Sequence, residues 1–101
     1  MNLPKDVKIQ IQNSFKQESK AAEEMIQKKF AGTGLSYRII RCVLFIADGN
    51  LKKLARYIEI AKTDYRDVIF FAEYTGHDSK HPRRIRNFNR PFGRHEIKSS
   101  D

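Results

Sequence analysis

A chain of 101 residues has room for one domain, and its 40% hydrophobic and 32% charged residues are typical of a globular protein rather than a disordered one. The single cysteine excludes an internal disulfide, and no apolar stretch approaches the roughly 20 residues that would span a bilayer. Residues 1–11 lack the apolar centre of a signal peptide. We therefore expect a cytoplasmic protein with no membrane partner.

Residues 4–30 predict two helices separated by a polar break. Pro4 suits the first turn of a helix, where its missing N–H would have no partner. One helical face is then marked by apolar residues at four-residue spacing: Val7, Ile11 and Phe15. After a polar stretch at 13–20, Ser19 can cap a second helix. The apolar stripe of that helix consists of Ala22, Met25, Ile26 and Phe30. A strand over 7–11 and a single helix over 4–30 are the alternatives.

Residues 37–48 predict a central helix, preceded by a glycine-rich loop at 32–34. The segment from Ile39 to Ala47 is apolar apart from Arg41, and a segment that is apolar nearly all round is a buried one. Its β-branched content would also suit a buried strand. We prefer a helix because Gly49 can take the left-handed position at its end and Asn50 can cap the next helix.

Residues 51–74 predict two further helices that meet at Asp64. The inner face of the first consists of Leu51, Leu54, Ile58 and Ala61. Asp64 can then accept a hydrogen bond from the N–H of Asp67 as an N-cap. The second helix, 65–74, would pack through Val68, Phe71 and Ala72. The apolar spacing continues unbroken to residue 72, so one long helix over 51–74 fits equally well.

The helical spacing ends at Gly76, and half of the net charge follows it. Residues 76–101 hold seven basic and three acidic residues, a net charge of +4 out of the total +8. We expect an irregular basic arm at 76–92 and a loose tail at 93–101. The predicted class is all-α: a compact bundle of four or five helices that forms, together with the docked arm, a single domain over 1–92.

The arm interleaves arginines with apolar side chains, and this pattern has two interpretations. In the one we favour, Ile85, Phe88 and Phe92 pack the arm onto the helices. The arginines would then pair with acidic side chains of the helices: Asp64, Asp67 or Glu73. In the other, the arginines neutralise phosphates of a nucleic acid and Phe88 or Phe92 stacks on unpaired bases. The candidate contacts for nucleic acid or another partner are Arg66, Arg83, Arg84, Arg86, Phe88, Arg90 and Phe92.

No set of residues in the sequence predicts catalysis, a cofactor or a metal site. Cys42 lies in an apolar segment with no histidine near it, so we expect a buried and unreactive thiol. His77, Asp78 and His81 carry metal-ligating atoms, but the flanking glycine and proline argue against the helix that would bring them together. We therefore expect a protein that is not an enzyme.

Residues 51–69 resemble the helix-turn-helix of DNA-binding proteins. The resemblance rests on Leu54, Ala55, Ile58, Ile60, Tyr65 and Val68. Glu59 stands where that pattern prefers a glycine for its turn. Asp64 and Asp67 would repel phosphates at the start of a recognition helix, which leaves Arg66 to reach a guanine edge.

A second resemblance covers about half of the chain. It comprises ADGNLKKL at 47–54, YI at 57–58, DYRDVI at 64–69, AEY at 72–74 and an Arg-x-Phe-x-x-Pro-Phe ending at 86–92. These segments are similar to a set of small bacterial proteins of unknown function. The resemblance implies that the fold extends through Phe92, and it implies no activity.

The functional hypothesis we favour is a small non-enzymatic module that binds another macromolecule, in the first place another protein. The alternative is nucleic-acid binding through the helix-turn-helix-like pair and the basic arm. Four further aromatic residues exceed what one small core can bury and are consistent with a homodimer: Tyr37, Tyr57, Phe70 and Tyr74.

Overall fold

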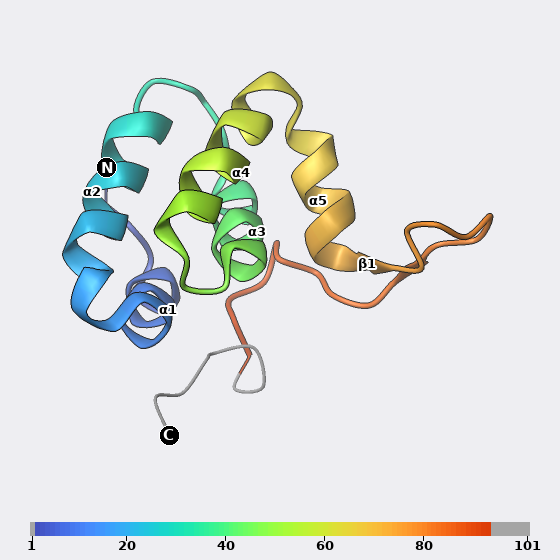
Figure 1. Cartoon of the computed structure of the whole chain (residues 1–101), viewed down its shortest axis with the longest axis horizontal. Helices are drawn as coiled ribbons and strands as arrows, with labels where there is room; N and C mark the ends of the chain where they lie inside the picture. Colours follow the sequence, from blue (N-terminus) through green and yellow to red (C-terminus); the bar gives the residue numbers. More distant parts are fainter. Residues whose placement is uncertain (1, 94–101) are drawn as a thin grey trace.

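The computed structural model describes residues 2–93, which form five α-helices, one 3-10 turn and a pair of two-residue strands (Figure 1). The elements are α1 (Lys5–Phe15), η1 (Lys16–Glu18), α2 (Ser19–Phe30), α3 (Tyr37–Ala47), α4 (Leu51–Thr63), α5 (Tyr65–Glu73), β1 (Tyr74–Thr75) and β2 (Arg83–Arg84). The predicted class, an all-α bundle with an irregular basic arm, is confirmed.

The predicted break between the first two helices is present. Lys16 has a positive φ (51°) and ends α1, which excludes a single helix over 4–30. The helical backbone of α1 excludes a strand over 7–11. The predicted cap at Ser19 is wrong, because this residue is the first of α2. Its hydroxyl donates to the carbonyls of Lys16 and Ile11, so it closes the end of α1 instead of capping α2.

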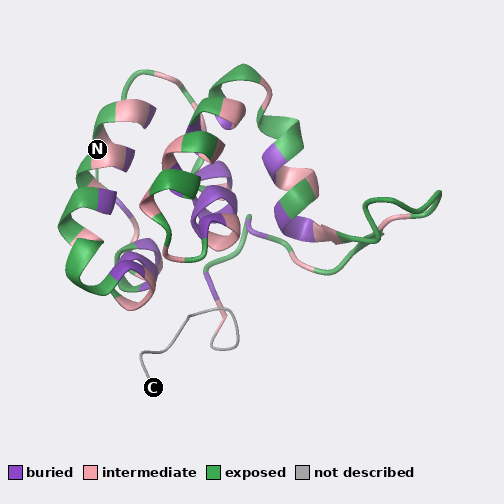
Figure 2. Ribbon diagram, in the orientation of Figure 1, coloured by how far each residue is buried: buried purple, intermediate pink, exposed green. Residues whose placement is uncertain are grey.

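Helix α3 lies at the centre of the bundle, where Figure 2 shows it as the most continuously buried element. It packs against α1, α4 and α5. Its backbone is helical, so the alternative of a buried strand is excluded. Gly49 takes the predicted left-handed conformation (φ 78°), as does Asp48 before it (φ 50°). Asn50 caps α4 as predicted, because its side-chain oxygen accepts from the N–H of Lys53 at 3.0 Å.

Helices α4 and α5 are separate, and the single helix over 51–74 is excluded. Asp64 between them has an extended backbone (φ −152°) and caps α5. Its side chain accepts from the N–H of Arg66 and not from that of Asp67 as predicted, because the N–H of Asp67 donates to the Asp64 carbonyl at 3.2 Å. Val68 and Ala72 are buried as expected, but Phe71 is 43% exposed. Glu73, which lies on the side of α5 opposite to Phe71, is buried together with Val68 and Ala72, so Phe71 points outward.

The segment after α5 forms a hairpin and then a docked arm, and the hairpin was not predicted. Strand β1 pairs with β2 antiparallel, Tyr74 opposite Arg84, and the hairpin extends away from the bundle beside α5 (Figure 1). The chain then returns across the helices with Phe88 and Phe92 buried. Ile85 is 47% exposed, so its predicted packing role is wrong. The predicted tail at 93–101 lies outside the described residues from 94 onward.

Candidate functional site

Glu73, the last residue of α5, is the centre of the arm's attachment. Its side chain is fully buried and accepts from two arginines. Arg38 of α3 approaches with Nε and Nη2, at 2.9 and 2.7 Å from the two carboxylate oxygens. Arg84 of β2 places Nε and Nη2 at 3.1 and 2.8 Å from Oε1. The sequence predicted an arginine on Glu73 but missed Arg38, which lies 35 residues away.

The same glutamate also holds the backbone of the arm. The N–H of Phe88 donates to Oε2 at 3.0 Å, and the N–H groups of Ile85 and Arg86 donate to the Glu73 carbonyl at 2.7 and 3.1 Å. Burial opposes ionisation of this carboxyl, but the hydrogen bonds from Arg38, Phe88 and Arg84 outweigh it and lower its pKa. Glu73 is therefore a charged carboxylate that fastens the arm to α5.

A second ion pair fastens the far end of the arm to α1. Arg41 of α3 donates from Nε and Nη2 to the carboxylate of Asp6, at 2.9 and 3.2 Å, and from Nη1 to the carbonyl of Phe88 at 3.1 Å. The N–H of Phe92 donates to Asp6 Oδ2 at 3.1 Å. Burial alone would raise the pKa of Asp6, but the hydrogen bonds from Arg41 and Phe92 together have the larger effect, so the pKa is below its ordinary value. Asp6 of α1 and the buried Arg41 of α3 thus both bind the arm.

Ring contacts complete the docking. Phe88 lies between Phe45 and Phe92, with ring centroids 5.2 and 5.3 Å apart. The Arg86 guanidinium lies 4.3 Å from the centroid of the Phe45 ring and donates to the carbonyl of Ala72 at 3.2 Å. Four of the predicted contact residues are therefore used within the molecule. Phe88 and Phe92 are not accessible for stacking on bases in this arrangement.

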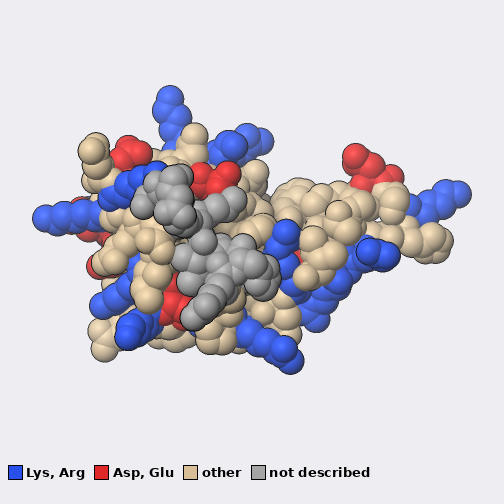
Figure 3. All heavy atoms as spheres, turned by 90° about the horizontal axis from the view of Figure 1, so that it is seen from below, with Lys and Arg blue, Asp and Glu red and all other residues tan. Residues whose placement is uncertain are grey.

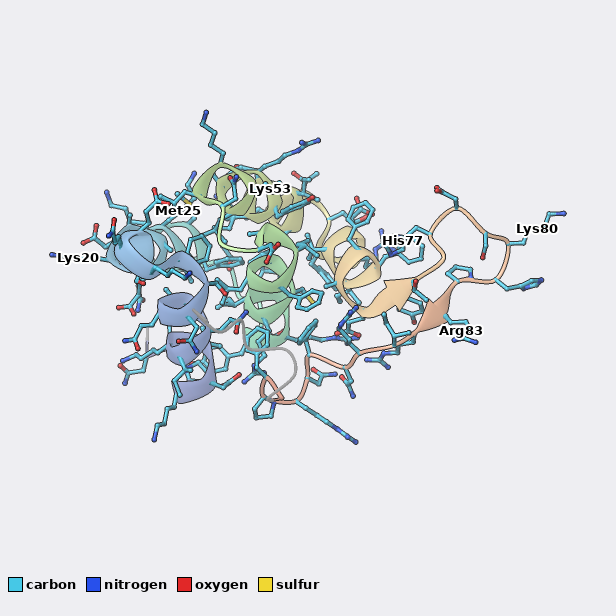
Figure 4. The ribbon with its side chains drawn as sticks, turned by 60° about the horizontal axis from the view of Figure 1, so that its bottom comes forward. Lys20, Met25, Lys53, His77, Lys80 and Arg83 are labelled. Carbon is cyan, nitrogen blue, oxygen red and sulfur yellow. The ribbon has the colours of Figure 1, made fainter. Side chains whose placement is uncertain are left out.

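The other three predicted contact residues are exposed but do not converge. Arg83 lies on the hairpin, which Figure 4 shows extending away from the bundle. Arg90 lies on the return segment of the arm. Arg66 is 77% exposed and makes two side-chain bonds to Asp64, each 2.9 Å. No arginine of the arm within residues 2–93 contacts Asp64 or Asp67, so that part of the predicted pairing is wrong.

The geometry of α4 also contradicts the helix-turn-helix resemblance. That pattern needs a turn near Glu59, but α4 continues through this residue to Thr63. Glu59 lies on the helix surface, where Lys29 of α2 donates to it at 3.3 Å. The only break in the region is the single residue Asp64.

Four aromatic rings gather where α5 meets the hairpin. This outer aromatic cluster consists of Phe70, Phe71, Tyr74 and His77. The ring centroid of Phe70 lies 4.8 Å from that of His77, and His77 Nε2 lies 3.1 and 2.8 Å from the carbonyls of Phe70 and Tyr74. The sequence indicated surplus aromatics at 70 and 74 but not that His77 would join them.

Cys42 and His77 both make contacts within the fold. Cys42 is buried, as expected, with its Sγ 3.8 Å from Glu73 Oε2; burial and the neighbouring carboxylate raise the pKa of its thiol. Within residues 2–93, no three His, Cys, Asp or Glu side chains are close enough together to bind a metal ion. His77 instead contacts carbonyls at the end of α5.

Positive charge is spread over the surface and continues onto the hairpin and the arm, as Figure 3 shows for one face. The exposed cations of the hairpin and the arm are Lys80, Arg83, Arg84 and Arg90.

Among the described helices, none has the length and apolarity that crossing a membrane requires. Comparison with known protein families, with curated proteins and with solved structures finds no match for the chain.

Proposed function

We propose that this chain is a small non-enzymatic binding module that recognises another protein through the exposed aromatic side chains of α5 and the adjoining hairpin. The observation that carries the proposal is the inverted polarity of α5. This helix exposes Tyr65 by 48% and Phe71 by 43%, whereas the side chain of its terminal acid, Glu73, is completely buried.

Exposed aromatic groups of this size favour association. Burying an apolar side chain of this class stabilises by about 1.5–3 kcal/mol, and an exposed ring forgoes that stabilisation until a partner covers it. Aromatic residues and arginine are enriched at protein interfaces and dominate their binding energy. The hairpin that adjoins the outer aromatic cluster carries Arg83, which lies opposite Thr75, so both residue types are present in this part of the molecule.

The charge of the surface indicates the sign of the partner. The chain carries a net charge of +8, and Lys80 and Arg83 extend it along the hairpin (Figure 4). A cationic surface accelerates encounter with an acidic partner and disfavours basic ones. We therefore propose a partner with an acidic binding face.

Nucleic-acid binding is the rival function, and the geometry favours it less. Of the seven residues that the sequence offered for such contacts, Arg84 and Arg86 are bound to other groups of the chain, and Phe88 and Phe92 are buried. The exposed cations that remain on the hairpin would give a salt-sensitive and sequence-independent interaction.

Photo-cross-linking from two positions tests the proposal. A photoreactive phenylalanine analogue is placed at Phe71, or at Lys20 on the opposite side of the molecule (Figure 4), and the chain is irradiated in extract of its source cells. We expect a discrete protein adduct from position 71 that is absent from position 20. Equal adducts from both positions, or none from position 71, would contradict the proposal.

A titration separates the two functions. The purified chain is titrated with mixed DNA and RNA at low and at high salt, and the protein-binding account predicts that Phe71→Ala leaves any residual binding unchanged. Affinity that falls steeply with salt and depends on Lys80 and Arg83 would establish the rival.

A further inference from the structure

A groove beside the proposed interaction surface gives information on the chemistry of the partner. It lies between the beginning of α3 and the first half of α5 and has a volume of about 340 Å³. Its apolar walls are formed by Leu35, Ile39, Tyr65 and Ile69, and its polar lining includes Arg38 and Asn89. We call it the Arg38 groove. This volume is at the lower end of the roughly 300–1,000 Å³ of ligand pockets and suits one large side chain.

The polar side of the Arg38 groove carries uncompensated positive charge. Arg38 and Arg84 share one carboxylate, that of Glu73, so these three side chains have a net charge of +1. The Arg38 side chain is 24% exposed and uses Nε and Nη2 for Glu73. No group in residues 2–93 accepts a hydrogen bond from its Nη1, which keeps two N–H donors for a ligand.

We propose that the Arg38 groove receives a peptide segment of the partner protein in which a carboxylate stands next to a bulky apolar side chain. The apolar side chain packs against Tyr65 and Ile69, and the carboxylate accepts from Arg38. The inference rests on the proposed function, because Tyr65, one of the exposed aromatic residues of α5, also lines the groove.

The alternatives to an acidic segment fit the groove less well. A neutral segment leaves the excess charge of the arginine pair unmatched, and a basic segment adds to it. A carboxylate forms charge-assisted hydrogen bonds with a guanidinium, which are stronger than bonds between neutral groups.

The test uses the ¹⁵N-labelled full-length chain and a peptide with blocked ends, Gly-Ser-Glu-Phe-Ser-Gly, at millimolar concentration. We expect amide chemical shifts to change around residues 34–39, 65–69 and 89. Replacing the glutamate of the peptide by glutamine, or its phenylalanine by alanine, should weaken binding about fivefold or more. The absence of shifts at the groove, or equal binding of the glutamine peptide, would overturn the proposal.

Two variants of α5 serve as a matched pair. Tyr65 and Phe71 are similarly exposed, but only Tyr65 lines the groove. Tyr65→Ala should abolish the peptide shifts and Phe71→Ala should retain them; equal losses would show that the peptide does not use the groove. If photo-cross-linking from position 71 gives a protein adduct but the peptide does not bind, only the groove proposal is rejected. If the peptide binds at the groove but cross-linking gives no adduct, the proposed function through the wider surface is rejected.

Discussion

Glu73 connects more of the molecule than any other side chain described here. It accepts from Arg38, from Arg84 and from the N–H of Phe88, and it lies on an otherwise apolar interior face of α5. A buried ion pair adds little net stability compared with apolar packing, but removing one partner leaves the other charge uncompensated. The substitution of Glu73 is therefore expected to be far more damaging than that of a surface acid.

Glu73→Gln should lower the free energy of unfolding by about 3 kcal/mol, because two guanidinium groups lose their counter-charge while the size of the side chain is kept. Denaturation by urea measures the change. Glu59→Gln is the matched control: its ion pair with Lys29 is exposed at both ends, 58% and 39%, so a loss of less than about 1 kcal/mol is expected. Equal losses in the two variants would contradict this role for Glu73.

The pH dependence of stability follows from the same carboxylates. The pKa values of Glu73 and Asp6 in the folded chain lie below their ordinary values of 4.5 and 3.8. The unfolded chain therefore binds protons first as the pH falls. Stability from these groups is complete above about pH 5.5 and is lost progressively below about pH 4.5. In Glu73→Gln and Asp6→Asn the acid-side slope should be smaller; an unchanged slope would show that other groups cause it.

At the scale of elements, the turn after α3 brings two helices into close contact. Gly49 has a φ of 78°, and a Cβ added there would lie 2.3 Å from the backbone oxygen of Ser14 near the end of α1. Gly32 has nearly the same backbone (φ 74°), but an added Cβ meets nothing within 4 Å. Comparing substitutions at the two glycines therefore distinguishes the energetic cost of backbone strain from the cost of steric overlap.

Gly32→Ala should cost about 1 kcal/mol, the strain of a left-handed alanine. Gly49→Ala should cost clearly more, because the backbone of α1 or of the turn must also move. Thermal unfolding of the two variants measures the difference. If Gly49→Ala were no more destabilising than Gly32→Ala, the close approach of the turn to Ser14 would be wrong.

The sequence predicted elements well where a local signal was present. Gly49, Asn50 and Asp64 mark ends of helices through their own backbone and side-chain chemistry, and each is found at such an end. The sequence was less informative where the partner of a side chain lies far away in the sequence. Arg38 could not be assigned to Glu73, because the two meet only after α3 and α5 have packed.

The errors at Phe71 and Ile85 have the same origin. Helical spacing allowed Phe71 on the inner face, but the burial of Glu73 rotates that face away from it. In the arm, burial alternates along the chain: Phe88 is buried and Arg86 partly buried, whereas Ile85 and Asn87 are exposed. Apolar character alone therefore did not show which side of the arm would contact the helices.

At the scale of the whole molecule, the arm joins elements that are far apart in the sequence. It is bonded to α5 through Glu73, to α3 through Arg41 and to α1 through Asp6. The radius of gyration of the Cα atoms, 13.0 Å, is that of a compact domain of about 100 residues, although the hairpin projects from it. The arm thus completes the core, and α5 and the hairpin present the exposed aromatic surface.

The most direct test of this division between core and surface is the unfolding free energy of two variants, Phe88→Ala and Phe71→Ala. Phe88 is 1% exposed and its truncation should cost about 3–5 kcal/mol, whereas Phe71 is 43% exposed and its truncation should change stability by less than about 0.5 kcal/mol. Comparable destabilisation by the two substitutions would contradict the account, since Phe71 would then belong to the core and would not be available to a partner.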